Sequence, residues 1–205
     1  DENQHTPAHL AARLGRLDSL EQELSSIDAE LARVVKRYDT AARKLSRARG
    51  KAAKKLGAEV MRLLAQLGMP ATRFETALPP RESGVPHPGG QEQVEFLIAT
   101  HEGHPPRPLG RIASGGELSR ISLAIQVATS ETSHVPTLVF DEVDAGIGGA
   151  TAETVGRLMR DLGARAQIIC VTHLPQVAAH GHVHYQVERK AGTTITRLTE
   201  KSRAT

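Results

Sequence analysis

Thr-Leu-Val-Phe-Asp-Glu-Val-Asp, residues 137–144, is the stretch that decides the fold of this chain. A short apolar run that ends abruptly in acidic residues is typical of a buried strand. In an open α/β sheet, ligands bind just beyond the carboxyl ends of such strands. We therefore expect Asp141 and Glu142 to stand side by side at a functional edge. The alternative is that these carboxylates only mark the start of a helix.

A second strand is predicted downstream, at 167–172, and it ends at His173. Between the two strands, residues 151–162 read as a helix, and 175–179 form a further short helix. The order strand, helix, strand implies parallel strands with a right-handed crossover. Parallel strands would place His173 on the same edge as the acidic pair. The helix is expected to turn four residues inward: Val155, Leu158, Met159 and Leu162.

Ser114-Gly115-Gly116-Glu117 precedes a helical run at 118–129. Two glycines before a helix let the backbone approach a ligand closely, and the helix start offers free N–H groups to an anion, commonly a phosphate. The Ser114 hydroxyl adds a donor. A plain loop with a serine cap is the alternative, and the motif alone does not decide. The inward face of this helix is expected to hold Leu118, Ile121, Ile125 and Ala128.

Residues 6–68 read as one long helix with a heptad pattern. Proline is absent from residue 8 to 69, and Gly68-Met69-Pro70 supplies a stop signal. Such a pattern argues for a coiled coil, which needs a partner helix. No second heptad segment occurs here, so the partner must come from another chain or from the rest of the polypeptide. The first heptad position is held by Leu10, Leu17, Leu24, Leu31, Tyr38 and Leu45, and the fourth, from Leu17 on, by Leu20, Ile27, Val34, Ala41 and Ala48.

The length of the chain is enough for one domain, or for one domain plus an extension. The chain has 205 residues, of which 39% are hydrophobic and only 2% aromatic. The core must be aliphatic, and stacking platforms for single-stranded nucleic acid are not expected. Cys170 is the one cysteine, which suits a reducing cytosol. No apolar run approaches the roughly 18 residues that span a bilayer, and the polar start at Asp1, without Met, reads as the beginning of a fragment.

The flanking segments carry weaker signals. Strands are expected at 71–78 and 93–100, with Pro- and Gly-rich connectors at 79–91 and 101–110. The second connector holds His101 and His104, but no cysteine or acidic cluster joins them, so a metal site is not expected there. A C-terminal hairpin is predicted from strands at 183–188 and 193–198 around Lys190-Ala191-Gly192.

The motifs together resemble those of the ATP-binding-cassette ATPases. Residues 113–117 look like the signature motif, 138–142 like the Walker B strand, 143–146 like the D-loop, and His173 like the switch histidine. The stretches 113–120, 140–149 and 171–178 resemble most closely a bacterial SMC-like family of DNA repair ATPases, along nearly the whole chain. The resemblance implies an α/β fold: a coiled-coil arm helix at 1–68, then at 69–205 the C-terminal lobe of an ABC-type ATPase head, with a mostly parallel sheet and flanking helices.

One departure from the family matters. The Walker A pattern Gly-x-x-x-x-Gly-Lys-Ser/Thr is absent, since the only Gly-Lys pair, Gly50-Lys51, is followed by alanine. In the family, this loop lies in the N-terminal half, before the coiled coil. The resemblance therefore implies that the chain is the C-terminal half of such a protein. It also implies that the chain is inactive alone, and that the missing half supplies both Walker A and the second arm helix.

Residue roles follow from the resemblance as expectations. Glu142 would be the general base, and His173 would sense the γ-phosphate of ATP. Asp141 would hold Mg²⁺, through water. Asp144 would link the two sites of a homodimer formed through the heads, with Arg120 contributing to that coupling. The nucleotide bound to the opposite head would contact Ser114, Gly115, Gly116 and Glu117.

A basic run suggests a polyanion partner. Eleven Lys and Arg residues lie between Arg33 and Arg62, opposed only by Asp39 and Glu59. A solvated helix face is the alternative reading. With the resemblance, the expected partner is double-stranded DNA, in the bacterial cytoplasm at the nucleoid and without a membrane. The candidate contacts are Arg43, Lys44, Arg47, Lys51, Lys54 and Lys55.

Three other functions compete with a DNA repair ATPase. Another SMC-like chromosome or repair ATPase would share all the motifs. A transporter ATPase subunit would share the signature and Walker B residues, but it would not carry some 40 residues of heptad helix before them. A non-enzymatic coiled-coil module would use the motifs as caps and turns. Against it, adjacent carboxylates at a buried strand end are costly without a cation or a solvent-facing site.

Overall fold

The computed structural model describes residues 7–82, 85–112, 114–189 and 196–201. Ala113 of the signature motif and the expected turn Lys190-Ala191-Gly192 lie outside the described residues. The chain divides into two compact units: residues 1–50 with 79–93, and residues 51–78 with 94–205. In the described part, no helix is both long enough and apolar enough to cross a membrane.

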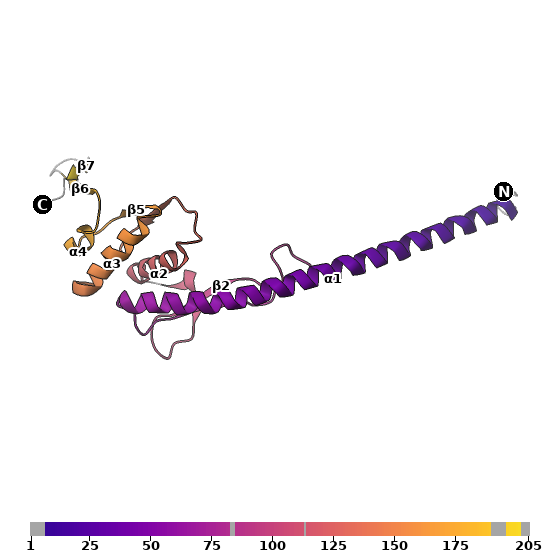
Figure 1. Ribbon diagram of the computed structural model, residues 1–205, viewed down its shortest axis with the longest axis horizontal. Coiled ribbons are helices and arrows are strands. Elements are labelled where there is room, and N and C mark those ends of the chain that lie inside the picture. The colour runs from indigo at the N-terminus through magenta and orange to yellow at the C-terminus, as the bar shows by residue number, and fades with distance from the viewer. Residues whose placement is uncertain (1–6, 83–84, 113, 190–195, 202–205) are drawn as a thin grey trace. The chain divides into compact units, whose positions relative to one another are not determined.

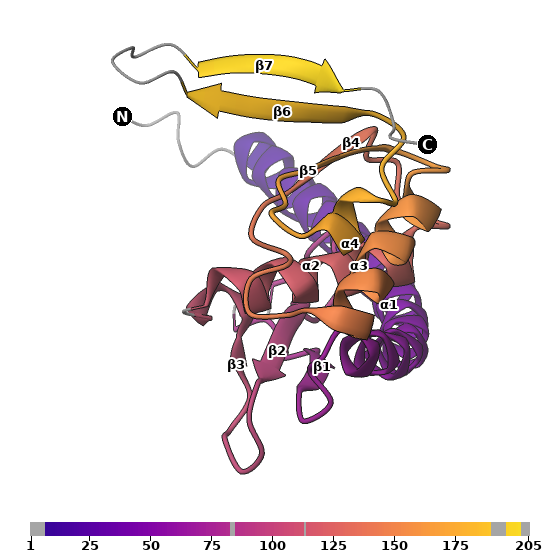
Figure 2. The same ribbon diagram turned by 90° about the vertical axis from the view of Figure 1, so that its left-hand side faces the viewer.

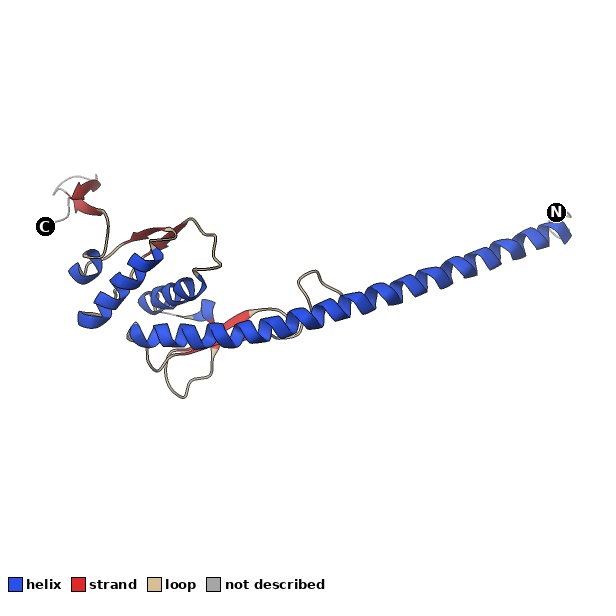
Figure 3. Ribbon diagram, viewed as in Figure 1, coloured by secondary structure: helices blue, strands red, loops and turns tan. Residues whose placement is uncertain are grey.

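Helix α1 runs without interruption from Pro7–Gln66, as the heptad pattern predicts (Figures 1 and 3). The helix ends at Gln66, just before the predicted stop signal Gly68-Met69-Pro70. Gly68 adopts a φ of +78°, and the Met69 N–H donates to the Leu64 carbonyl at 2.9 Å. A left-handed glycine that lets later N–H groups reach the last carbonyls is a common helix ending.

In the first unit, residues 79–82 and 85–93 pack against α1, and we call these described residues the strap. A β-bridge joins Pro80 to Glu92, and the Gln93 N–H donates to the Pro79 carbonyl at 2.9 Å. The two ends of the connector expected at 79–91 are therefore joined to each other. The heptad residues Leu10 to Val34 are exposed along α1.

In the second unit, three short strands form an antiparallel sheet in the order β1-β2-β3. They are β1 (Arg73–Ala77), β2 (Glu95–Ala99) and β3 (Arg107–Pro108), and Phe74 is paired with Ile98. The strands expected at 71–78 and 93–100 are confirmed. The sequence did not indicate β3 or the 3-10 turn η2 (Leu109–Arg111), because two or three residues carry no periodicity.

The strand of the opening motif is β4 (Thr137–Phe140), and it pairs in parallel with β5 (Gln167–Cys170). Helix α3 (Gly149–Leu162) makes the crossover, and α4 (Pro175–Ala178) follows β5 (Figure 2). Phe140 is opposite Cys170, so the two strands end at the same edge. The parallel pairing expected around the acidic residues is confirmed, whereas the other described strand pairings are antiparallel.

The C-terminal hairpin joins β6 (His184–Arg189) to β7 (Thr196–Lys201) in antiparallel register. Figure 2 shows the two strands side by side. The predicted hairpin is confirmed, with its second strand starting three residues later than expected.

The core of the second unit joins the end of α1 to α2 (Gly115–Thr129) and α3. All four residues predicted to face inward on α3 are buried. The prediction for α2 was wrong at Leu118, which is exposed, while Leu123 and Ala124 are fully buried. Apolar residues occur on nearly every side of α2, so periodicity could not select the buried face. The core residues of α1 are Val60, Leu63, Leu64 and Leu67.

Candidate functional site

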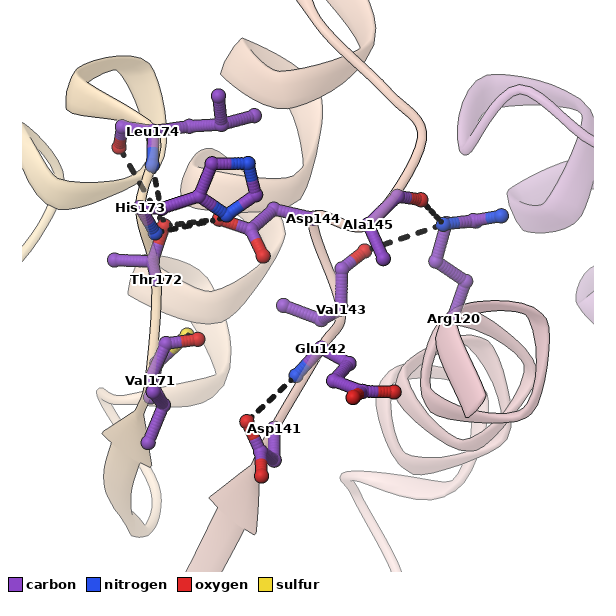
Figure 4. A network of polar contacts seen from close by, with 11 residues as sticks. Arg120, Asp141, Glu142, Val143, Asp144, Ala145, Val171, Thr172, His173 and Leu174 are labelled. Atoms are coloured by element: carbon purple, nitrogen blue, oxygen red, sulfur yellow. Dashed lines mark hydrogen bonds and ion pairs between the residues drawn. The ribbon is translucent and has the colours of Figure 1, made fainter. Parts of the chain in front are cut away.

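The acidic pair lies on a tight turn directly after β4 (Figure 4). Asp141 and Glu142 are both exposed. The Glu142 N–H donates to Asp141 Oδ1 at 2.9 Å, and the Ala145 N–H donates to the Glu142 carbonyl at 3.0 Å. Glu142 has a φ of +55°, which is costly for a residue with a side chain. The turn therefore holds two carboxylates toward solvent at the expense of backbone strain.

Helix α2 begins at Gly115, beside this turn. The Ser114 hydroxyl caps the helix by accepting the Glu117 N–H at 3.4 Å. A Cβ on Gly115 would overlap the Glu142 carboxylate, and one on Gly116 would lie 2.9 Å from the Ala145 Cβ. The two glycines are therefore needed where the helix start approaches the chain's own acidic turn. The serine cap predicted as the alternative is present, and the anion site remains a prediction.

Two side chains of α2 donate hydrogen bonds to backbone carbonyl groups of the turn. The Ser119 hydroxyl donates to the Asp141 carbonyl at 2.6 Å. Buried Arg120 donates from Nη1 to the Ala145 carbonyl at 2.7 Å and to the Val143 carbonyl at 3.5 Å. Burial lowers the pKa of the Arg120 guanidinium. Arg120 was expected to take part in coupling between heads, but its side chain is buried and bonds to carbonyl groups of the same chain.

Asp144 joins the turn to the end of β5. Its carboxylate is 2% exposed, and Oδ2 accepts hydrogen bonds from the Thr172 hydroxyl and, at 3.0 Å, from the His173 N–H. Burial would raise the pKa of Asp144, but these hydrogen bonds and the nearby His173 outweigh it, so the pKa lies below its ordinary value. Asp144, expected to link two heads, thus directs its carboxylate to its own His173.

His173 is positioned but accessible. Its Nδ1 lies 3.3 Å from Asp144 Oδ2, while 70% of its side chain is exposed. The Leu174 N–H donates to the Thr172 hydroxyl at 3.1 Å, which fixes the hydroxyl that Asp144 binds. Figure 4 shows the imidazole beside the Asp144 carboxylate. One ring nitrogen is thus engaged with the chain, and most of the ring faces solvent.

The structure brings together most of the predicted site residues. The acidic pair, the glycine-led start of α2 and the Asp144–His173 contact share one edge of the β4–β5 sheet. Ser119 and Thr172 were not predicted as site residues, although both lie inside the motifs quoted from the sequence. Hydroxyl side chains are too common for such contacts to be read from a sequence, because their partners here are 22 and 28 residues away.

The six basic candidates lie on α1 and are exposed. None of the six forms an ion pair within the described part of the chain. Other members of the basic run are paired: Arg62 with Glu59 at 2.6 Å, Arg33 with Glu30 at 3.3 Å, and Arg49 with Glu92 at 3.5 Å. The charges available to an external anion are therefore fewer than the sequence count suggested.

The donor set fits part of a magnesium site. Among the described residues, no group of three His, Cys, Asp or Glu side chains could hold a metal ion alone. Mg²⁺ usually keeps several waters and takes one or two carboxylates together with substrate phosphates. Exposed Asp141 matches that requirement, so the residues fit an ion whose other ligands are water and nucleotide.

Several curated proteins are similar to this chain. It is 49% identical over 180 residues to the DNA repair protein RecN of Xylella fastidiosa, covering 88% of this chain and 32% of that protein. RecN of Vibrio cholerae is 41% identical over 197 residues, covering 95% and 35%. RecN of Bacillus subtilis is 35% identical over 200 residues, covering 90% and 35%. No family model matches the chain.

Solved structures of Smc heads share the fold. The Smc head domain with an extended coiled coil from Pyrococcus furiosus, bound to the C-terminal domain of ScpA, aligns with a TM-score of 0.62 and 18% identity. That alignment covers 91% of this chain and 44% of the other. The Smc head with a coiled coil and joint from Pyrococcus yayanosii gives 0.58 and 22%, covering 95% and 34%. With a long helix before a small parallel sheet, the chain has the fold of the C-terminal part of an SMC-like head, and it belongs with the RecN proteins as a segment that spans about a third of their length.

Proposed function

We propose that this chain forms the C-terminal lobe of the ATP-binding and hydrolysing head of an SMC-like protein acting in DNA double-strand-break repair and recombination. Residues 69–205 would form the lobe and 1–68 the arm. The observation that carries the proposal is the exposed Asp141–Glu142 pair packed against the glycine-led start of α2. The similarity to proteins named for DNA repair, and to Smc heads in fold, supports it.

Glu142 would act as the general base. Its carboxylate is exposed, and the strained turn holds it at the end of β4. A carboxylate in that place can accept a proton from a water molecule attacking the terminal phosphate. Asp141 would bind Mg²⁺ through water, and the ion would neutralise charge on the phosphates.

The start of α2 would bind the phosphates of ATP. Its free N–H groups and positive dipole end favour an anion, and Ser114 and Glu117 flank the two glycines. We propose that this nucleotide belongs to the opposite head of an ATP-dependent homodimer. In this chain Gly115 lies against its own Glu142, so a site within one chain is the alternative to be tested.

His173 would sense the terminal phosphate, and Asp144 would act through it. The buried Asp144 carboxylate holds both Thr172 and His173. A shift of residues 143–146 at a dimer interface would therefore move the imidazole. This is how Asp144 could couple two sites while its own side chain stays buried.

The N-terminal half of the same protein is the proposed partner of this lobe. One face of the β4–β5 pair is apolar and open, with Val139 67% exposed and Val171 and Ile169 also exposed. Parallel strands are normally covered on both faces, so this face calls for a cover. The missing half would provide it, together with the Walker A loop and the second arm helix.

Mixing two mutants tests the composite site. The complete protein carrying Glu142→Gln and the complete protein carrying Ser114→Arg should each lose ATPase activity by about 100-fold or more. In a composite dimer, mixing them restores one intact site and a substantial fraction of the activity. A site within one chain gives no recovery. Glu131→Gln, on an exposed residue after α2, is the matched control and should leave activity unchanged.

A second test concerns the missing half. The chain alone should not hydrolyse ATP, and activity should appear when the N-terminal half is added. Glu142→Gln should abolish that activity while ATP-driven dimerisation persists. Hydrolysis by the chain alone, indifferent to Glu142→Gln, would show that the assignment of the site is wrong.

DNA binding would use the six exposed basic residues. Contacts with phosphates give sequence-independent binding that weakens with salt. Replacing Lys51, Lys54 and Lys55 by glutamine should reduce affinity for duplex DNA and the slope of its salt dependence. Arg62→Gln is the control, because Arg62 is already paired with Glu59. Equal losses in both variants would argue against a defined surface.

A further inference from the structure

The strap packs its backbone directly on α1. The His87 N–H donates to the Tyr38 hydroxyl at 3.0 Å, and Arg49 Nη1 lies 3.5 Å from Glu92 Oε2. Gly90 has a φ of +85°, and a Cβ there would lie 2.9 Å from Leu45 Cδ2. No other element can enter between the strap and this flank of the helix.

Backbone hydrogen bonds join the two ends of the strap. The Arg81 N–H donates to the Gln91 carbonyl at 2.8 Å, next to the bond from the Gln93 N–H to the Pro79 carbonyl. Ala42, one turn after Tyr38 on α1, is only 3% exposed. The segment is therefore a small packed structure on the arm.

The flank that the strap covers continues the heptad seam. Tyr38 follows Leu31 by one heptad, and seven residues return an α-helix to within about 20° of the same direction. Yet Leu31 is 58% exposed, whereas Tyr38 contacts the strap. The first heptad position is therefore open at Leu31 and occupied at Tyr38, while Ala41 in the fourth position stays exposed.

We propose that the strap ends the coiled coil. A second arm helix, from the part of the polypeptide outside this chain, packs on the seam from Leu10 to Val34 and leaves it at Tyr38, where the strap takes its place. Packed helices lie about 8–10 Å apart, so a helix and the strap cannot share one flank. The inference rests on the second arm helix of the proposed function.

Two observations identify that occupant. The chain spans about a third of the length of the RecN proteins it matches, so enough polypeptide remains for a second helix. The Smc head that aligns with 91% of this chain carries an extended coiled coil. The exposed seam residues are leucine, isoleucine and valine at heptad spacing, which fits a helix with the same pattern.

The strap also leaves one side of α1 free. Lys44 follows Ala42 by two residues, and Arg47 follows Leu45 by two, which places each about 200° around the helix from the covered position. Both basic residues are exposed. At the arm base, the helix thus presents the strap on one side and basic side chains on the other.

Photo-crosslinking in the complete protein tests the proposal. The amino acid p-benzoylphenylalanine is placed singly at Leu31, Tyr38 or Leu45, and the attached peptides are identified by mass spectrometry. Position 31 should attach to a segment outside residues 1–205. Positions 38 and 45 should attach to a peptide containing residues 82–92. Thr40, exposed on the other side of α1, is the control and should give neither product.

The outcomes separate the two claims. If positions 38 and 45 attach to the same outside segment as position 31, and not to the strap, the proposal is overturned. If position 31 attaches to nothing outside this chain, the second arm helix itself is refuted and the inference falls with it. A strap product at position 38 would in that case still show that the strap lies on the arm.

Discussion

The acidic turn and the arm differ in how far their side chains find partners within this chain. Around the turn, the Arg120 and Asp144 side chains are buried, and each makes two hydrogen bonds within the chain. Along α1, the leucines from Leu10 to Leu31 remain exposed. The chain therefore builds the scaffold of the candidate site internally, whereas the arm depends on something outside. Pairs of matched mutations should show this contrast as a difference in their effects.

The largest contrast should come from leucines on the same helix. Leu64→Ala removes a fully buried side chain and should lower the unfolding free energy by about 2–5 kcal/mol. Leu31→Ala in this chain should change it by no more than about 0.5 kcal/mol. Urea denaturation measures both. Equal losses would mean that the seam is already covered, for instance by self-association.

The buried carboxylate should come next. Asp144→Ala leaves the Thr172 hydroxyl and the His173 N–H without their acceptor, which should cost about 2–4 kcal/mol. Asp144→Asn keeps an acceptor oxygen and should cost less. Asp161→Ala, at an exposed position of α3, should be nearly neutral. If Asp144→Ala is as mild as the control in urea denaturation, the turn does not depend on this contact.

The approach of α2 to the turn gives a smaller effect. A Cβ on Gly116 would lie 3.2 Å from the Glu142 carbonyl as well as close to Ala145. Gly116→Ala should therefore destabilise the chain by about 1–3 kcal/mol. Gly110→Ala, where nothing lies within 4 Å, should be neutral or slightly stabilising. The same thermal or urea melts compare the two, and a neutral Gly116→Ala would mean that the helix start can move freely.

The strap should respond only locally. Gly90 and Gly103 have similar positive φ angles, of +85° and +80°, but only Gly90 has neighbours within 4 Å. Alanine at either position suffers backbone strain of about 1–2 kcal/mol, and Gly90→Ala must also displace Leu45. Hydrogen exchange at the His87 amide should accelerate in Gly90→Ala. It should be unchanged in Gly103→Ala, and acceleration in both would remove the case for a specific contact.

The pH dependence should be the smallest effect. The pKa of Asp144 is lower in the folded chain than its ordinary value, so the unfolded chain binds more protons near that value. The stability from this group is complete above about pH 4 and declines as the pH falls through the folded pKa. Asp144→Asn should flatten that acid limb of the unfolding free energy. If the loss of unfolding free energy at acid pH is unchanged in Asp144→Asn, other carboxylates cause it.

Local sequence patterns identified the elements but not all their faces. Heptads and the Gly68 stop gave the extent of α1, and the apolar runs gave β4 and β5. The prediction of the inward face of α2 was wrong at Leu118, because α2 has apolar residues on nearly every side. From the sequence, the strap was predicted only as a Pro- and Gly-rich loop. Its contact with α1 could not be predicted, because Gly90 and Leu45 are 45 positions apart in the chain.

The sequence alone was enough to identify the motifs, their order and the place of Asp141 and Glu142 at a strand end, because strand and helix signals are local and the motifs lie at their ends. Only the tertiary structure showed that Asp144 and Arg120 point inward, that Gly115 and Gly116 make room for the chain's own turn, and that the strap contacts Tyr38 and Leu45. Those facts depend on side chains brought together from distant segments. Packing and hydrogen bonding between such segments leave no periodic trace in the sequence.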